Sequence, residues 1–338
     1  MKLRERLNLI KKKKLFLGII LASVLIGASI IITFVYVENF SEKNVDKFPD
    51  FITKNEDYFT ARIGPIPEID SNTYKLVVWG QINNPKNFTL SELQALDLID
   101  RTLTTECIGN FPKGPLLSTA VWRGFLLYDL LESLGLKENA TGVRYMAADG
   151  YYVSHTLDQI RDNGTIGALY MNGKILPLVQ GFPLRIVNPG SYGAKQPAWV
   201  IEIEVMDRPL EDYWDDRGWD TSPPMDVDST IFFPKDGVNV KVGVAFEVGG
   251  AAFGGTRISK IEYTLNDGLN WSNADIVKSV DLDHVWVFWK ALITIELPGT
   301  FNISIKATDI YNNTQPMIDS NLVDGINSWP TLIVIVND

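Results

Sequence analysis

The segment Leu15–Val37 constrains the chain most, because its 23 residues include no charged side chain. A helix needs about 20 apolar residues to cross the hydrocarbon core of a bilayer, whereas the apolar part of a cleaved signal peptide has roughly 7–15. Four lysines, Lys11–Lys14, come directly before this segment. We therefore predict an uncleaved transmembrane helix over residues 15–37, with the basic segment 1–14 in the cytoplasm and the rest of the chain outside.

Charge divides the chain at the same place. Residues 1–14 carry seven Lys/Arg and one Glu, a net charge of +6, and the remainder carries 24 basic and 40 acidic residues, a net charge of −16. An acidic body argues against a nucleic-acid partner, because a phosphate backbone needs a basic surface. Residues 38–57 are polar and charged, and they predict a tether between the membrane and the folded body.

Strand and helix patterns alternate from about residue 58 to 226, which predicts a mixed α+β domain. Thr89–Leu93 is typical of a helix start, and apolar residues recur at helical spacing across Trp122–Leu136. The pair Asn172-Gly173 predicts a tight two-residue hairpin turn. The segment Asp207–Asp226, rich in Asp, Trp and Pro, predicts a linker.

The sequence pattern changes from about Val227, where short predicted strands separated by turn signals follow one another and helix patterns cease. This pattern predicts an immunoglobulin-like β-sandwich over residues 227–338. The run Gly249–Gly255 lacks the Lys-Ser/Thr ending of a nucleotide-binding loop, so we interpret it as a sandwich loop.

Cys107 is the only cysteine in the 338 residues, so it cannot form an internal disulfide. The residues before it suit a strand and Ile108-Gly109-Asn110 ends that strand, which places the thiol at a strand end. Such a thiol is either a buried small hydrophobe or a soft ligand to a metal. One cysteine and two histidines supply neither a c-type haem attachment, nor an iron–sulfur cluster, nor a three-histidine zinc site.

The loop Cys107-Ile-Gly-Asn resembles the Cys-Ala-Gly-Asn loop of the sulfite oxidase family of molybdopterin enzymes. The resemblance continues in the same order from about Phe59 almost to the C-terminus. It implies a molybdopterin-binding oxidoreductase domain over residues 58–226, with molybdenum bound by Cys107. Ile261–Trp271 resembles a hairpin of the family's dimerisation domain, which implies that residues 227–338 form a homodimer.

Further motifs resemble family segments that bind the substrate and the cofactor. Phe59–Pro67 resembles the family segment whose arginine faces the substrate beside the metal, which implies that role for Arg62. The segment from Gln180 to Arg185 is similar to a His-Gly-Phe-Pro-x-Arg motif that binds the pterin, and Asn188–Lys195 resembles a phosphate-binding glycine loop. The resemblance implies a cofactor site formed by Arg62, Cys107, Asp149, Gln180, Arg185 and Lys195.

Two positions depart from the family pattern. Phe111-Pro112 stands where the family's sulfite oxidases have two arginines, and Trp219 stands where they have a tyrosine over the metal. Both changes remove hydrogen-bond donors from the site. We therefore predict a reaction site with Arg62, Cys107 and Trp219 that oxidises sulfite weakly and prefers a less charged or larger substrate.

The sequence as a whole predicts a membrane-anchored, externally facing molybdopterin oxidoreductase that transfers an oxygen atom to or from a small oxygen-bearing substrate. Because the chain offers no second redox site, electrons would pass to a separate partner protein. Two alternatives remain. One is a reductase of sulfoxides or other oxo compounds in the same family, and the other is a cofactor-free cell-surface interaction protein on the same fold.

Overall fold

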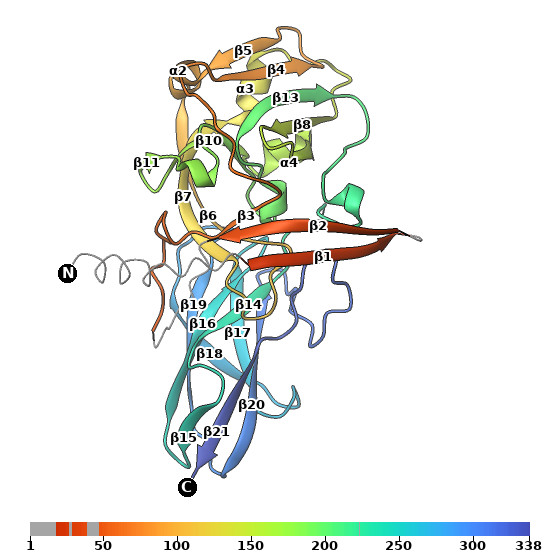
Figure 1. The fold of residues 1–338 in the computed structure, drawn as a ribbon. Helices are drawn as coiled ribbons and strands as arrows, with labels where there is room; N and C mark the ends of the chain where they lie inside the picture. Colours follow the sequence, from red (N-terminus) through yellow and green to blue (C-terminus); the bar gives the residue numbers. More distant parts are fainter. Residues whose placement is uncertain (1–17, 27–28, 39–46, 223) are drawn as a thin grey trace, which may run out of the picture.

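The computed structural model describes residues 18–26, 29–38, 47–222 and 224–338, and they form two domains stacked end to end (Figure 1). The first domain combines strands with short helices, and the second consists of strands. This arrangement confirms the α+β class and the β-sandwich that follows it. The C-terminus lies at the end of the sandwich that is remote from the first domain.

Two five-stranded sheets build the first domain. One has the order β11-β10-β7-β6, with β12 also paired to β10, and the other has the order β5-β4-β13-β8-β9. The strands are β4 (Lys75–Gly80), β5 (Lys86–Thr89), β6 (Leu98–Glu106), β7 (Leu117–Leu126), β8 (Gly142–Ala147), β9 (Tyr152–Thr156), β10 (Ile166–Met171), β11 (Lys174–Ile175), β12 (Arg185–Val187) and β13 (Val200–Met206). The helices are α2 (Leu90–Gln94), α3 (Leu127–Ser133) and α4 (Leu157–Asp162).

Local signals determine where α2 and the β10–β11 hairpin form. The Thr89 hydroxyl accepts from the Glu92 amide at 3.3 Å, and the Glu92 carboxylate accepts from the Thr89 amide at 2.8 Å, which is a capping box. Asn172 and Gly173 both have positive φ, 51° and 73°, as a two-residue hairpin of the I′ type requires. Both predictions are confirmed.

The helix predicted over residues 122–136 is only partly present. β7 continues to Leu126, and α3 occupies only Leu127–Ser133. β7 lies between β6 and β10 and pairs with both, so its backbone groups gain hydrogen bonds on two sides. This long-range pairing outweighs the helical spacing of the side chains.

The second domain is an eight-stranded sandwich with the strand order β14-β16-β19-β18-β17-β20-β21-β15. Its core joins residues from both halves of this path, such as Val248 and Trp289 from the first half and Ile303 and Val334 from the second. The strands are β14 (Asp228–Phe233), β15 (Val238–Lys241), β16 (Phe246–Phe253), β17 (Ile258–Thr264), β18 (Ser272–Lys278), β19 (Val287–Ile293), β20 (Gly299–Asp309) and β21 (Thr331–Asn337).

The predicted loop over Gly249–Gly255 is wrong, because most of this run lies in β16. A Cβ atom at Gly250 would lie 1.8 Å from the Thr230 carbonyl oxygen, and one at Gly249 would lie 2.3 Å from the Phe233 ring. The glycines therefore allow β14 to pack closely against β16. They serve strand packing and not chain mobility.

Part of the predicted tether is buried at the junction of the two domains. Phe51 is 8% exposed, and its carbonyl accepts from the Trp286 indole at 3.0 Å. Phe48 stacks on Phe288 with ring centroids 4.9 Å apart. Residues 47–57 are therefore folded, because their aromatic side chains supply core to the junction despite the charged residues around them.

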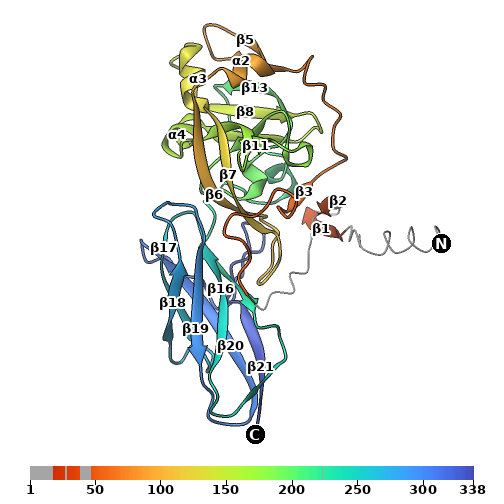
Figure 2. The ribbon, with the colours of Figure 1, turned by 90° about the vertical axis from the view of Figure 1, so that its left-hand side faces the viewer.

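The described part of the predicted membrane segment forms strands and not a helix. β1 (Gly18–Ile26) pairs antiparallel with β2 (Ser29–Glu38), and β2 pairs with β3 (Thr60–Arg62) beside the domain junction (Figure 2). Both long strands are rich in Ile and Val, whose branched side chains favour strands. Among the residues that the structure describes, no helix is long and apolar enough to cross a membrane. The predicted cytoplasmic segment 1–14 and residues 39–46 lie outside the described residues.

Candidate active site

A cavity of about 400 Å³ brings together side chains from both domains and from the linker that connects them. Its wall includes six of the seven site residues that the sequence predicts, namely Arg62, Cys107, Asp149, Gln180, Arg185 and Trp219. They come from segments that are far apart in the chain, so only the folded domain brings them together.

Cys107 follows the last residue of β6, at the strand end that the sequence predicts. Its backbone N–H donates to the Leu116 carbonyl at 3.0 Å, and its carbonyl accepts from the Asn110 N–H at 2.8 Å, which closes a tight turn. The Asn110 amide also donates to Glu106 at 2.9 Å. Burial raises the pKa of the Cys107 thiol to about 11, so a bound cation is needed to keep it as a thiolate at neutral pH.

Arg62 and Asp149 supply opposite charges to the cavity wall. Arg62 ends β3, and its guanidinium donates to the Gly64 carbonyl. The Asp149 carboxylate accepts from the Tyr151 N–H at 3.1 Å. Burial raises the pKa of Asp149, while that hydrogen bond and the positive charge of Arg62 act in the opposite direction. The two side chains therefore influence each other electrostatically.

Gln180 ends a short 3-10 helix (Leu178–Gln180), and Arg185 begins β12 on the same cavity wall. The Gln180 amide nitrogen donates to the carbonyls of Tyr58 and Phe59 at 3.2 and 3.4 Å, so it fixes the segment that leads to Arg62. The Arg185 guanidinium donates to the Gln180 carbonyl at 3.2 Å and lies 5.4 Å from the Trp122 ring centroid. Burial lowers the pKa of Arg185. A buried guanidinium of this kind gains from a bound anion.

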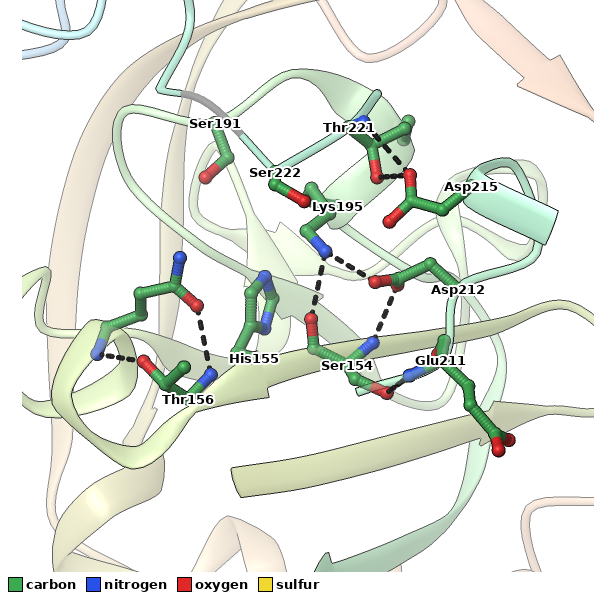
Figure 3. A network of polar contacts seen from close by, with 12 residues as sticks. Ser154, His155, Thr156, Ser191, Lys195, Glu211, Asp212, Asp215, Thr221 and Ser222 are labelled. Carbon is green, nitrogen blue, oxygen red and sulfur yellow. Dashed lines mark hydrogen bonds and ion pairs between the residues drawn. The ribbon is translucent and has the colours of Figure 1, made fainter. Parts of the chain in front are cut away.

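Lys195 does not line the cavity, so the prediction that it holds the cofactor finds no support in its position. Figure 3 shows its side chain directed toward Asp212 and Ser154. The ammonium lies 2.7 Å from the Asp212 carboxylate and donates to the Ser154 carbonyl at 2.9 Å. Asp212 also accepts from the Ser154 N–H at 2.7 Å, and burial raises its pKa despite the ion pair. The buried pair ties the glycine loop to the start of the linker.

Trp219 lies on the linker, where it covers the loop that carries Cys107. A Cβ atom placed on Gly109 would lie 3.8 Å from the Trp219 ring. The backbone N–H of Trp219 donates to the Trp214 carbonyl at 3.1 Å, and the centroids of the two indole rings are 6.3 Å apart. Phe111 and Pro112 are absent from the described cavity wall, and Phe111 is 52% exposed.

Several cavity residues had no signal in the sequence. Tyr151 donates from its hydroxyl to the Ala194 carbonyl at 2.6 Å, which connects the Asp149 turn with the glycine loop. Trp199 has a φ of 55°, which is unusual for a large side chain and turns the backbone where β13 begins. Leu322, Val323 and Ile326 reach the cavity from the sandwich.

The buried polar atoms on this wall that have no hydrogen-bond partner among the described residues include the Arg185 Nε and the Gln196 Oε1. The first is a charged donor and the second is an acceptor. Buried polar groups without partners are rare in folded proteins and commonly mark a ligand site. A ligand that carries both an anionic group and an N–H donor would satisfy them together.

Comparison with known proteins agrees with this geometry. Residues 63–214 match the family described as the oxidoreductase molybdopterin binding domain. Residues 220–336 match the family described as the Mo-co oxidoreductase dimerisation domain. The two matches cover most of the chain and meet within the linker.

The relatives include sulfite oxidases of plants and animals. Sulfite oxidase of Arabidopsis thaliana is 28% identical over 326 residues, which cover 79% of this chain and 82% of that protein. The mitochondrial sulfite oxidase of Rattus norvegicus is 29% identical over 314 residues, and the match spans only 57% of its length. Among solved structures, the sulfane dehydrogenase SoxCD from Paracoccus pantotrophus shares the fold with a TM-score of 0.76 at 18% identity, over 95% of this chain and 91% of that chain.

Proposed function

We propose, from the premise that the chain belongs to the molybdenum-cofactor-dependent oxidoreductases related to sulfite oxidase, that it carries out oxygen-atom transfer on a small oxygen-bearing substrate. The convergence of Cys107, Arg62 and Arg185 on one cavity carries this proposal. These residues supply a soft metal ligand, a cation for the substrate and a cation for an anionic cofactor group.

The cavity wall fits molybdopterin. The cofactor's phosphate would satisfy the buried Arg185 guanidinium, and an N–H group of its pterin would satisfy the Gln196 Oε1. Cys107 would bind the molybdenum through its sulfur. When bound, the metal supplies two-electron redox chemistry at a centre that exchanges oxygen with water.

The protein side chains position the substrate and shield it from water. Arg62 donates hydrogen bonds to a substrate oxygen and orients the atom that reacts. Trp219 covers the Cys107 loop and Trp214 lines the same cavity, and their apolar rings lower the local dielectric and strengthen the interaction with Arg62. Asp149 beside Arg62 limits the net positive charge that the substrate meets.

The electrons pass to or from a separate carrier protein. The chain has one cysteine and two histidines, and the described residues contain no group of three or more His, Cys, Asp or Glu side chains placed to bind a further metal ion. The direction of transfer then depends on the carrier.

Metal analysis tests this function directly. The full chain, purified in detergent from a host that makes the cofactor, should contain about one molybdenum per chain, because one thiolate and one cavity serve one metal. Folded protein that lacks molybdenum under these conditions would reject the enzyme and leave the cofactor-free interaction protein.

Although the described part of residues 15–37 pairs as β1 and β2, we propose further, from the sequence, that this segment anchors the chain in a membrane with the folded body on the external side. The absence of charge over 23 residues and the four preceding lysines support this topology. Protease added to intact cells should cleave the body while the chain remains in the membrane fraction after a carbonate wash. Protection of the body, or release by carbonate, would argue against it.

The sandwich provides a surface for a homodimer. Leu292 on β19 is 69% exposed, and Ile276 and Val277 on the neighbouring β18 are 38% and 48% exposed, so two adjacent strands carry exposed apolar side chains. A stable dimer would bury on the order of 2,000 Å² or more. Light scattering at micromolar concentration should show a dimer that Leu292→Glu converts to monomer. A wild-type monomer would leave the sandwich as a spacer.

A further inference from the structure

The sandwich contributes part of the cavity wall. Leu322, Val323 and Ile326 belong to the long connection between β20 and β21, and all three line the cavity. We call residues 319–327 the wall loop. The Leu322 side chain is 55% exposed, so it presents apolar surface to whatever enters the cavity.

One carboxylate fixes the shape of the wall loop. Asp319 accepts from the backbone N–H of Asn321 at 2.8 Å and from that of Asn327 at 3.3 Å, so it holds both ends of the loop. The Asn321 side chain donates to Asp324 at 2.6 Å. These bonds fold the loop on itself before any substrate binds.

Two contacts fix where the wall loop sits. The Asp220 N–H donates to the Val323 carbonyl at 3.0 Å, which joins the loop to the residue after Trp219. Gly325 has a φ of 129°, and a Cβ atom there would lie 2.2 Å from the Tyr192 hydroxyl oxygen. The loop backbone thus packs directly against the first domain, and no side chain fits between them. The apolar wall is preorganised.

Trp214 and Trp219 extend this wall from the linker. The linker and the sandwich together present five apolar side chains to the cavity. The cations on the described wall are Arg62 and Arg185. Arg62 lies close to the negative charge of Asp149, and Arg185 binds the cofactor in our proposal. A compact dianion such as sulfite gains most from several convergent cations. This cavity instead suits a single negative charge beside an apolar group.

We propose that the substrate is an organic sulfinate, R–SO₂⁻, with its charged group at Arg62 and its apolar substituent against Leu322, Val323 and Ile326. This assignment rests on the proposed function. In the reaction, R–SO₂⁻ + H₂O gives R–SO₃⁻ + 2 H⁺ + 2 e⁻. A new S–O bond forms with oxygen from water, sulfur loses two electrons to the separate carrier, and both protons pass to solvent.

The test uses the full-length molybdenum-loaded protein with ferricyanide, which accepts one electron per ion. Benzenesulfinate should exceed sulfite at least ~10-fold in kcat/KM, because one methylene-sized apolar contact already discriminates by about 10–200-fold. Leu322→Gln and Val323→Thr should each raise KM for benzenesulfinate several-fold while changing sulfite kinetics less than about twofold. Leu297→Gln, at a 67% exposed sandwich position outside the described cavity wall, is the matched control and should change neither.

Binding gives a readout without turnover. Calorimetric titration with benzenesulfonate, the product, should show binding that weakens several-fold in Leu322→Gln and Val323→Thr and stays unchanged in Leu297→Gln. Molybdenum-loaded protein that prefers sulfite, or that reduces dimethyl sulfoxide and leaves benzenesulfinate untouched, would overturn the substrate assignment while the enzyme class stands. Protein without molybdenum would remove both proposals.

Discussion

The cavity has two kinds of wall, and they come from different parts of the chain. The first domain supplies every charged side chain of the described wall, Arg62, Asp149 and Arg185, beside apolar ones such as Trp199. The linker and the sandwich supply apolar groups, represented by Trp219 and Leu322. The polar wall matches what a cofactor and an anionic group need, and the apolar wall adds contact area for a substituent. Binding the cofactor and choosing the substrate are therefore separable properties of this fold.

Replacing the proposed metal ligand, Cys107, should have the largest effect on the polar wall. We expect Cys107→Ser to abolish turnover and to remove the thiolate-to-metal absorption, because the harder hydroxyl oxygen is a poor ligand for a metal that selects sulfur. Serine is nearly isosteric with cysteine, so circular dichroism and the unfolding temperature should stay close to wild type. Turnover at the wild-type rate would show that Cys107 is a core residue and not a ligand.

The buried ion pair that connects the two walls should have the next largest effect. Lys195→Met leaves the carboxylate of Asp212 buried without its cation, which typically costs about 3–5 kcal/mol of unfolding free energy. The linker with Trp214 and Trp219 then loses this buried ionic attachment to the glycine loop. Urea unfolding measures the stability, and Lys195→Arg, which keeps the charge, is the matched variant.

If Lys195 instead holds the cofactor, stability should change little, whereas molybdenum content should fall. Equal stability of Lys195→Met and wild type, together with lost metal, would restore the original prediction and place the side chain in the cavity.

A substitution at Arg62 alters the polar wall and leaves the proposed metal ligand, Cys107, in place. A charge-assisted hydrogen bond to the substrate contributes about 1.5–3 kcal/mol, or roughly one to two decades in kcat/KM. We therefore expect Arg62→Gln to lower kcat/KM by this factor for every anionic substrate, with unchanged molybdenum content. Arg123→Gln, which alters an exposed arginine that pairs with Asp100, is the control. A loss confined to one substrate would instead mean that Arg62 helps to choose between substrates and does not bind the anionic group that they share.

The sequence predicted those parts of the fold that depend on neighbouring residues. Thr89 and Glu92 form their capping box within four residues, and Asn172-Gly173 adopts its turn from its own backbone preferences. The end of β7 and the burial of Phe51 depend on partners far away in the chain. No local pattern contains those partners, so a helix and a tether were predicted in their place.

The candidate site divides in the same way, between residues that a local motif identifies and residues whose partners lie far away in the chain. Cys107, Arg62 and Arg185 carry recognisable chemistry in recognisable motifs, and they line one cavity. Lys195 was predicted to face a phosphate because nothing near it in sequence revealed Asp212 as its partner. The contribution of the wall loop to the cavity was not predicted, because exposed apolar residues such as Leu322 have no chemical signature until the fold places them at a cavity.

The smallest expected effect is on the pH dependence of stability, at the place where the linker meets the first domain and the wall loop. Asp226 ends the linker, and its backbone N–H donates to the Tyr192 hydroxyl at 3.4 Å. Burial raises the pKa of Asp226 to about 6, with further contributions from the negative charges of Asp324 and Asp319 in the wall loop. In the unfolded chain an aspartate titrates near 3.9. Between about pH 4 and pH 6 the folded protein therefore holds more protons than the unfolded chain.

The contribution of Asp226 to stability should fall as pH rises through this window and level off above it, because deprotonation leaves a negative charge buried and beside two others. Asp226→Asn removes this titration, so the melting temperature of the variant minus that of wild type should increase from pH 4 to pH 7 by a few degrees. The difference cancels every other titrating group that the two proteins share. Asp275→Asn, at an exposed position on β18, is the control. A flat difference for Asp226→Asn would mean that neither burial nor the wall-loop carboxylates act on Asp226, and that packing and backbone hydrogen bonds, such as the one from the Asp220 N–H to the Val323 carbonyl, hold the linker and the wall loop together.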